Sequence, residues 1–403
     1  MSEWREVKLK DADCKFLSGY AFKSKDYSNK GIPLIKIGNI QNHKVGIDLN
    51  GTFINAALVT DKLSKYLLCN NDVLIAMTGQ GSVGRVGKLN LPLNEKALLN
   101  QRVGKFTTTN TELNLNYLYY VLSSPAYQDF LFNAGSGSGQ PNLSPELILE
   151  TEIAIPPLPE QQAIAEVLSS LDDKIDLLHR NNKTLEEMAD LLFNENYITD
   201  TRKAPLKLKE IVETSGGYNH DLSELSEDGD ILLSMGSITK KYGLNLDRCR
   251  HIKKPNADSK ILAVTGDIII STRDITQDAD LLGSPVIISK RIKKRIIVGS
   301  NLYKLEIIDQ GIETIWLYFL LRSKSYREYV KEVASGTSIL MLKKEDLLNF
   351  EFHPPVSNGT KLTSALTHLC NKIEANNEQI QMLNQTRNTL LPKLMSGQVR
   401  VKN

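Results

Sequence analysis

The sequence predicts an α+β protein with an internal duplication, in which each copy is a strand-rich domain followed by a long helix. Three observations support this prediction: segments repeated at nearly one offset, short β-branched runs in both halves, and two long heptad patterns. The composition is that of a globular chain, because 41% of the 403 residues are hydrophobic and 24% are charged.

The repeat is visible at five places. Pro156-Pro157 recurs as Pro354-Pro355, and residues 168–176 recur as 366–374, both at an offset of 198 residues. Residues 117–124 match 316–323 at 199, 38–40 match 236–238 at 198, and 72–75 match 267–270 at 195. Such agreement indicates an internal duplication. It divides the chain into a first domain at 1–155, a central helix at 156–203, a second domain at 204–353 and a C-terminal helix at 354–403.

Both domains have a mixed pattern. Short runs of Ile, Leu and Val between turn residues indicate strands at 32–37, 73–77, 267–271 and 285–289. Helical patterns close the domains at 116–132 and 314–333. Strands and helices within one segment predict the α+β class for each domain.

The two long helices follow a heptad of alternating four- and three-residue steps. This spacing keeps one seam facing a partner helix, whereas the alternative is an amphipathic helix packed on its own domain. Four heptads in both copies favour mutual pairing. The first seam is Ile164, Leu168, Leu171, Ile175, Leu178, Asn182, Leu185, Ala189 and Leu192, and the second is Leu362, Leu366, Leu369, Ile373, Asn376, Ile380, Leu383, Arg387 and Leu390.

Polar and charged residues add detail to these helices. Asn182 and Asn376 each interrupt a seam, where a buried polar residue fixes register. Residues 160–203 have five Lys or Arg against ten Asp or Glu, whereas residues 356–403 have six against two, so the segments can attract each other. Pro159 suits a first helical turn, and Pro392 with Gly397 is expected to end the second helix.

Several classes of protein are disfavoured. The cysteines at 14, 69, 249 and 370 form no CxxC pair and the six histidines form no HExxH pattern, so a disulfide framework or a metal site is not expected. No apolar run approaches the roughly 20 residues of a membrane span. The N-terminus has no apolar signal region, and we expect a cytoplasmic protein without a membrane partner.

The whole chain resembles the specificity subunits of Type I restriction–modification systems. The similar segments are Ile155-Pro-Pro-Leu-Pro-Glu-Gln-Gln162, Leu171-Asp-Asp-Lys-Ile175 and Leu390-Leu-Pro-Lys-Leu-Met-Ser-Gly397. Residues 37–40, 72–75 and 267–273 resemble strand motifs of the family's target-recognition domains. One departure is residues 354–361, where the family usually repeats Pro-Leu-x-Glu-Gln.

The resemblance implies a fold and a function. Two target-recognition domains of mixed strands and helices would be separated by two long helices that pair as an antiparallel coiled coil. Each domain would read one half of a bipartite, asymmetric sequence in double-stranded DNA. The helices would space the half-sites and bind two methyltransferase (modification) subunits, which the restriction (motor-nuclease) subunits join. S-adenosylmethionine, ATP and Mg are expected on those partners, and no cofactor on this chain.

The segment from Gly79 to Gly84 reads GxGxxG after an apolar strand. A dinucleotide site needs a helix that starts in such a loop, whereas residues 85–92 have strand-like alternation, which favours a hairpin. By the resemblance such loops approach DNA, and the candidate contacts are Gln80, Ser82, Arg85 and Lys88. Gln140 and Asn142, in a second loop, have the amide chemistry that suits adenine, and a plain turn is the alternative for each residue.

In the second half, Thr272 and Arg273 leave a strand into a loop. Arg273 is a candidate for guanine or phosphate, and the alternative is an ion pair with Asp274, Asp278 or Asp280. Basic clusters nearby are a possible phosphate track or a solvated face. Their candidate residues are Lys240, Lys241, Lys290, Arg291, Lys293 and Lys294.

No catalytic residue is predicted. The sequence has no Asn/Asp-Pro-Pro-Tyr/Phe motif of amino-methyltransferases, no GxxxxGK[ST] phosphate loop and no Asp…Glu-x-Lys nuclease cluster. Binding of DNA is therefore favoured over chemistry. The alternatives are a nucleotide-dependent enzyme that uses the Gly79–Gly84 loop and a coiled-coil scaffold without DNA contact.

Overall fold

The structure, a computed structural model, describes residues 4–48, 50–92, 94–109, 111–136, 141–196, 204–240, 242–253, 257–309, 311–354 and 359–401. The chain divides into two compact units, Met1–Asp176 with Gln381–Asn403 and Leu177–Ile380. Each unit contains one strand-rich domain and a part of both long helices, α5 (Leu158–Asn196) and α9 (Gly359–Met395). The boundary between the two compact units therefore lies within both long helices. The division of the chain into four parts, made from the sequence, stays a prediction.

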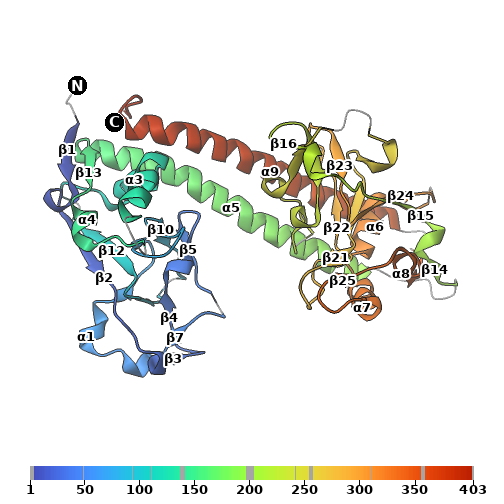
Figure 1. The fold of residues 1–403 in the computed structure, drawn as a ribbon, viewed down its shortest axis with the longest axis horizontal. Coiled ribbons are helices and arrows are strands. Elements are labelled where there is room, and N and C mark those ends of the chain that lie inside the picture. The colour runs from blue at the N-terminus through green and yellow to red at the C-terminus, as the bar shows by residue number, and fades with distance from the viewer. Residues whose placement is uncertain are drawn as a thin grey trace. The chain divides into compact units, whose positions relative to one another are not determined.

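The first domain has two main sheets (Figure 1). One has the order β2-β12-β9-β10-β6-β5, formed by Cys14–Ser18, Val103–Thr108, Val73–Ala76, Val86–Leu89, Lys44–Val45 and Ile40–Gln41. The other has the order β3-β7-β4-β11-β8, formed by Tyr27–Ser28, Phe53–Ile54, Ile32–Ile35, Ala97–Leu99 and Leu67–Leu68. A separate pair joins β1 (Arg5–Lys8) to β13 (Glu152–Ile155), and the helices are α1 (Asp61–Ser64), α2 (Leu115–Ser123), α3 (Pro125–Gly135) and α4 (Pro145–Leu149).

The second domain repeats this topology. Its sheet β15-β24-β20-β22 corresponds to β2-β12-β9-β10 and consists of Val212–Gly216, Leu302–Ile307, Ile268–Ser271 and Pro285–Ile287. The sheet β16-β18-β17-β23-β19 corresponds to β3-β7-β4-β11-β8 and consists of Leu225–Ser226, Arg250–Ile252, Asp230–Leu233, Ile296–Val298 and Leu262–Ala263. β14 (Leu206–Lys207) pairs with β26 (Glu351–Phe352), and β21 (Arg273–Asp274) with β25 (Leu340–Met341). The duplication and the α+β class are therefore confirmed.

Helices close both domains, but each predicted helix is two helices. In the first domain α2 ends at Ser123 and α3 begins with Pro125, whose fixed φ suits a first helical position and whose missing N–H interrupts a helix. In the second domain the predicted helix divides into α6 (Thr314–Leu320) and α7 (Lys324–Val333), with α8 (Lys344–Leu348) following. Tyr117 of α2 and Trp316 of α6 are almost fully buried, which places both helices in the domain cores.

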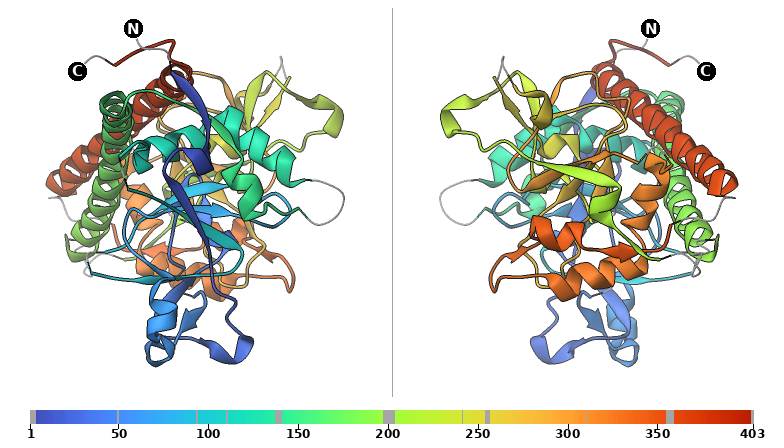
Figure 2. Two further views of the ribbon diagram at one scale, coloured as in Figure 1. Left: turned by 90° about the vertical axis from the view of Figure 1, so that its left-hand side faces the viewer. Right: turned by 90° about the vertical axis from the view of Figure 1, so that its right-hand side faces the viewer.

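The long helices α5 and α9 lie side by side (Figures 1 and 2). No residue of either predicted seam is exposed, from Ile164 to Leu192 or from Leu362 to Leu390. In the first unit, Asp172 of α5 binds Arg387 of α9, and Glu160 binds Arg400, which follows α9. From Glu160 to Asp172 the residue number on α5 rises, whereas the residue number of the arginine partner falls from 400 to 387. The two helices are therefore antiparallel. The opposite charges of the two segments meet in these ion pairs.

The ends of the helices also pack on the domains. Ile164 and Leu168 of α5 belong to the same core as α2, with Leu394 of α9. Ala189 and Phe193 of α5 belong to the core of the second domain with Leu366. The heptad pattern alone leaves two alternatives, pairing of the long helices with each other and packing of each helix on a domain. In the structure both occur together.

The two seam asparagines contact each other in the second unit. Asn376 donates its side-chain N–H to Asn182 at 2.8 Å, and Asn182 donates to Asn377 at 2.8 Å. Asn182 is 6% exposed and Asn376 is 4% exposed. Because any slip of one helix along the other would leave these amides unpaired, the contact fixes the register.

The end predicted for the second long helix is confirmed at Gly397 but wrong at Pro392. α9 continues through Pro392 and ends at Met395, and Gly397 then adopts a left-handed φ of 69°. Proline removes only its own N–H, and its carbonyl still accepts the N–H of Ser396 at 3.0 Å. Among the described residues, none of the helices combines the length and the hydrophobicity that a membrane span requires.

Candidate DNA interface

The Gly79–Gly84 segment is the loop of a hairpin. β9 and β10 pair antiparallel, with Val86 opposite Ile75, and the next element after the loop is a strand rather than a helix. Gly84 has a φ of 80°, and a Cβ there would lie 2.9 Å from the Cβ of Leu131. Glycine is thus required by both backbone and packing. The hairpin prediction is confirmed, and the loop lacks the helix N-terminus that a dinucleotide site needs.

Backbone hydrogen bonds join the segment that contains this loop to two other segments of the first domain, and one of these two is joined to a third. Met77 N donates to Arg102 O at 2.9 Å, and Leu143 N donates to Met77 O at 2.7 Å. Tyr20 N donates to Leu99 O at 2.9 Å, and Gln101 N donates to Tyr20 O at 3.0 Å. We call residues 19–20, 77–85, 100–102 and 141–143 the first loop cluster.

The second domain has the same cluster. Thr272 N donates to Asn301 O at 2.9 Å, and Leu342 N donates to Thr272 O at 2.9 Å. Tyr218 N donates to Val298 O at 2.7 Å, and Ser300 N to Tyr218 O at 2.8 Å. Residues 217–218, 272–282, 299–301 and 335–342 form the second loop cluster, whose hydrogen bonds match those of the first.

The first loop cluster contains most of the predicted contacts of that domain. Gln80, Arg85 and Asn142 are exposed and Ser82 is half-buried, whereas Gln140 lies outside the described residues. The sequence interpretation missed Arg102, which is exposed in the same cluster. Its only sequence signal is its position directly before a strand, which does not distinguish it from other basic residues.

Lys88 does not share this surface. Its ammonium lies 4.6 Å from the ring centre of Tyr119 and 5.6 Å from that of Tyr120. Burial lowers the pKa of Lys88, against the opposing effect of Asp172 and Asp173 on α5. The side chain points from β10 toward aromatic groups of α2, because alternate residues of a strand face opposite sides. This geometry gives no support to a DNA contact by Lys88.

Three of the seven predicted basic residues of the second domain have acidic partners. Lys240 binds Asp280 at 2.8 Å, Arg291 binds Glu374 at 2.8 Å, and Lys294 binds Asp228 at 3.1 Å. Lys290 and Lys293 are exposed and have no ion pair with any residue that the structure describes, and Lys241 lies outside that part. The run at 290–295 therefore provides two free ammonium groups rather than a continuous phosphate track.

Arg273 belongs to the second loop cluster, next to the buried Thr272. Of the three aspartates weighed as its partners, Asp280 binds Lys240, and Asp274 accepts hydrogen bonds from Thr276 and from Leu281 N at 2.7 Å. Burial opposes ionisation of Asp274, but these hydrogen bonds outweigh it and hold the carboxyl pKa below its usual value. Within the described ranges the Arg273 guanidinium has no ion pair.

Comparison with known proteins identifies the family. The model of the family described as Type I restriction modification DNA specificity domain matches residues 1–187 and 203–385. The chain belongs to this family. Its function is DNA sequence specificity in a Type I restriction–modification system, and specificity subunits of these systems are generally not catalytic. The nucleotide-dependent enzyme and the scaffold without DNA contact are not supported.

Curated relatives and a solved structure agree with this assignment. The chain is 27% identical over 428 residues to the Type I restriction enzyme MjaIX specificity subunit of Methanocaldococcus jannaschii, which covers 99% of this chain and 94% of that protein. It is 24% identical over 371 residues to the MjaVIII specificity subunit of the same organism, covering 84% and 82%. The crystal structure of a Type I S subunit from M. genitalium has the same fold, with a TM-score of 0.61, 17% identity and coverage of 97% and 96%.

In this specificity subunit, side chains of the helices also fasten the domains. In the first unit, Asp172 of α5 accepts a hydrogen bond from the Tyr120 hydroxyl at 2.9 Å and one from Arg387 at 2.8 Å. Gln161, fully buried, accepts from Asn114 N and donates to Glu112 O, both at 2.8 Å. Gln161 belongs to the Pro-Leu-Pro-Glu-Gln motif, whose structural role is thus to hold the start of α2.

The second domain is fastened by different residues. Arg322 of α6–α7 donates to Asp190 of α5 at 2.6 Å, and its guanidinium lies 4.6 Å from the ring centre of Tyr242. Thr363 of α9 donates to Glu313, which precedes α6, at 2.5 Å. Residues 355–358, part of the segment 354–361 that departs from the family's motif, lie outside the described residues. Thr363 nevertheless contacts Glu313, which corresponds to Asn114 of the first domain. Sequence reasoning missed these pairs because their members are far apart along the chain.

Proposed function

We propose that each domain reads one half of a bipartite, asymmetric sequence in double-stranded DNA. The observation that supports this is the duplicated loop cluster, in which the same backbone hydrogen bonds present different side chains. The first cluster exposes Gln80, Arg102 and Asn142, whereas the second presents Arg273 and Asn301. Equivalent frames with different donors and acceptors suit two readers of different sequences. DNA contacts by the other free candidates, among them Lys290 and Lys293, remain part of this proposal.

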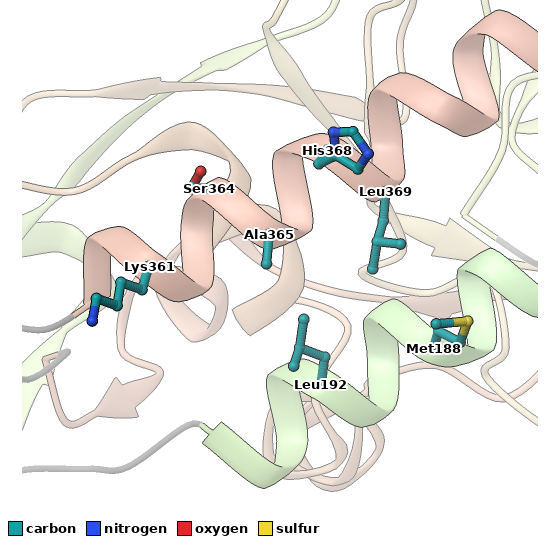
Figure 3. Close-up of a pocket in the computed structure, with 7 residues that line it drawn as sticks. All are labelled: Met188, Leu192, Lys361, Ser364, Ala365, His368 and Leu369. Atoms are coloured by element: carbon teal, nitrogen blue, oxygen red, sulfur yellow. The ribbon is translucent and has the colours of Figure 1, made fainter.

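The helices are proposed to space the half-sites and to bind two methyltransferase subunits, which restriction subunits join. In the second unit a groove of about 750 Å³ lies along α5 and α9 (Figure 3), lined by Met188, Leu192, Lys361, Ser364, Ala365, His368 and Leu369. Met188 is 51% exposed and the neighbouring Leu191 is 60% exposed. Large apolar side chains in water are costly, so these residues suit a partner helix.

Chemistry is assigned to the partners. S-adenosylmethionine would bind the methyltransferase subunits, and ATP and Mg the restriction subunits, while this chain binds none of them. The complex would act in the cytoplasm, since its substrate is DNA. This chain supplies sequence recognition, spacing and docking.

Reconstitution tests the proposal. The chain, its modification subunits and their mixture are each given S-adenosylmethionine and genomic DNA, and only the mixture is expected to methylate at a defined sequence. The variant Met188→Asp should reduce co-purification with the modification subunits. Lys183→Asp, at an exposed site on the same helix outside the groove, should not. Methyl transfer by the chain alone, or equal co-purification of both variants, would contradict the assignment.

A further inference from the structure

An apolar face is exposed in the second loop cluster. β21 and β25 pair antiparallel, with Arg273 opposite Met341 and Asp274 opposite Leu340. Because side chains alternate along a strand, Arg273 and Met341 point to one side of the pair, and Asp274 and Leu340 point to the other. Asp274, Leu340 and their neighbours on that side are buried. Met341 on the other side of the pair is 36% exposed, and Ile275 and Ile339, which lie directly beyond the ends of the two strands, are 65% and 44% exposed.

The loop that presents this face is held in one shape from within. Asp274 has no exposed surface and accepts hydrogen bonds from Thr276 N at 2.8 Å and Leu281 N at 2.7 Å. Beneath the loop, Arg327 of α7 donates to Leu282 O at 2.6 Å and to Ala279 O at 2.7 Å. Gln277 donates to Thr337 O at 2.9 Å and so ties the loop to the segment before β25. A rigid loop that leaves Ile275 in water is preorganised for a ligand.

Among the residues that the structure describes, the first domain exposes no aliphatic side chain at the equivalent place. At the equivalent place a single β-bridge joins Thr78 to Asn142, and the exposed residue that follows is Gln80. At this one place, the described residues are thus polar in the first domain and aliphatic in the second. Because the two domains share one fold, this difference in exposed side chains is expected to affect which DNA half-site each domain reads.

We propose that Ile275, Ile339 and Met341 contact thymine methyl groups in the major groove of the half-site read by the second domain. The 5-methyl group of thymine is the apolar feature of that groove, and aliphatic side chains are suitable contacts for it. Arg273, on the same face and without an ion pair among the described residues, supplies the positive charge that draws the face to DNA. The proposal rests on the function proposed above and adds the chemistry by which this domain selects its bases.

Replacing thymine by deoxyuridine, which lacks only the methyl group, tests the contact. The complex with the modification subunits is used, and its recognition sequence is first mapped by the positions of methylated bases. Each thymine of the second half-site is then replaced in a synthetic duplex. Loss of one buried methyl group should weaken binding by about fourfold, corresponding to about 0.8 kcal/mol.

Variants of the protein test the same contact from the other side. Ile275→Ala and, separately, Met341→Ala should bind the thymine duplex more weakly, and at least one of them should no longer distinguish thymine from deoxyuridine. Ile308→Ala is the matched control, because Ile308 is 50% exposed in the same domain but lies outside the cluster. It should keep the full fourfold difference.

Three results would overturn the proposal: wild-type binding that ignores every replacement, unchanged discrimination in both variants, or a half-site without thymine. A role of the face in binding a protein subunit would appear as loss of complex assembly in Ile275→Ala with unchanged discrimination. Failure of the underlying function is distinguishable, since the wild-type complex would then show no sequence preference at all.

Discussion

The buried asparagine pair gives a quantitative test of how the helices are aligned. In Asn182→Ala the amide of Asn376, 4% exposed, loses the acceptor that lies 2.8 Å away. An unsatisfied buried polar group costs about 1–3 kcal/mol, so we expect the free energy of unfolding to fall by about 2 kcal/mol. Asn376→Ala should be destabilised by a similar amount, because it removes the other half of the same hydrogen bond.

Replacing both residues by leucine has a different expected outcome. The double variant Asn182→Leu/Asn376→Leu has no unpaired amide from either residue and a continuous apolar seam, so it should be at least as stable as the wild type. Urea unfolding followed by circular dichroism measures all four proteins. A wild-type stability for Asn182→Ala, or a large loss in the double leucine variant, would refute the assigned role. The leucine pair should also relax the register, seen as methylation over a wider range of half-site spacings.

Three further changes follow from the same structure. Inserting seven residues after Leu178 and seven after Ile380 lengthens each helix by about 10.5 Å. At 3.4 Å per base pair, this predicts a DNA spacer longer by about three base pairs, which modification of a library with randomised spacers would show. An unchanged spacer in an active variant would contradict the role of the helices in spacing. Lys293→Ala should weaken binding to all sequences and reduce its salt dependence, more than Lys294→Ala does, because Lys294 already binds Asp228; equal salt slopes in Lys293→Ala and the wild type would remove Lys293 from the interface. Gly84→Ala should cost roughly 1–3 kcal/mol, because the left-handed backbone and the contact with Leu131 both oppose a side chain; a thermal melt as high as the wild type's would contradict this.

Local features of the fold were predictable from the sequence because they depend on short-range periodicity. The strands at 73–77 and 267–271 appear as β9 and β20, and the hairpin follows from glycines and alternation. The two seams avoid solvent throughout, since a heptad fixes which face a helix buries. Proline is less decisive: Pro125 divides the helix predicted at 116–132, whereas Pro392, expected to end a helix, lies inside one.

The candidate site was less predictable because it depends on tertiary contacts. Lys88 follows the glycine loop by only a few residues, yet its position on the strand turns it toward Tyr119. Arg291 and Lys294 read as free cations in sequence, but Glu374 and Asp228, both distant along the chain, neutralise them. Conversely, Arg102 enters the first loop cluster through a backbone hydrogen bond from Met77, which is distant along the chain. The DNA contacts of the individual loop residues stay predictions.

We propose that this chain specifies DNA sequence through two separate domains. Exchanging residues 204–353 for the second domain of another specificity subunit, followed by mapping of methylated bases, tests it most directly. We expect one half of the recognition sequence to change while the other half and the spacer remain the same. A change in both halves, or in neither, would contradict it.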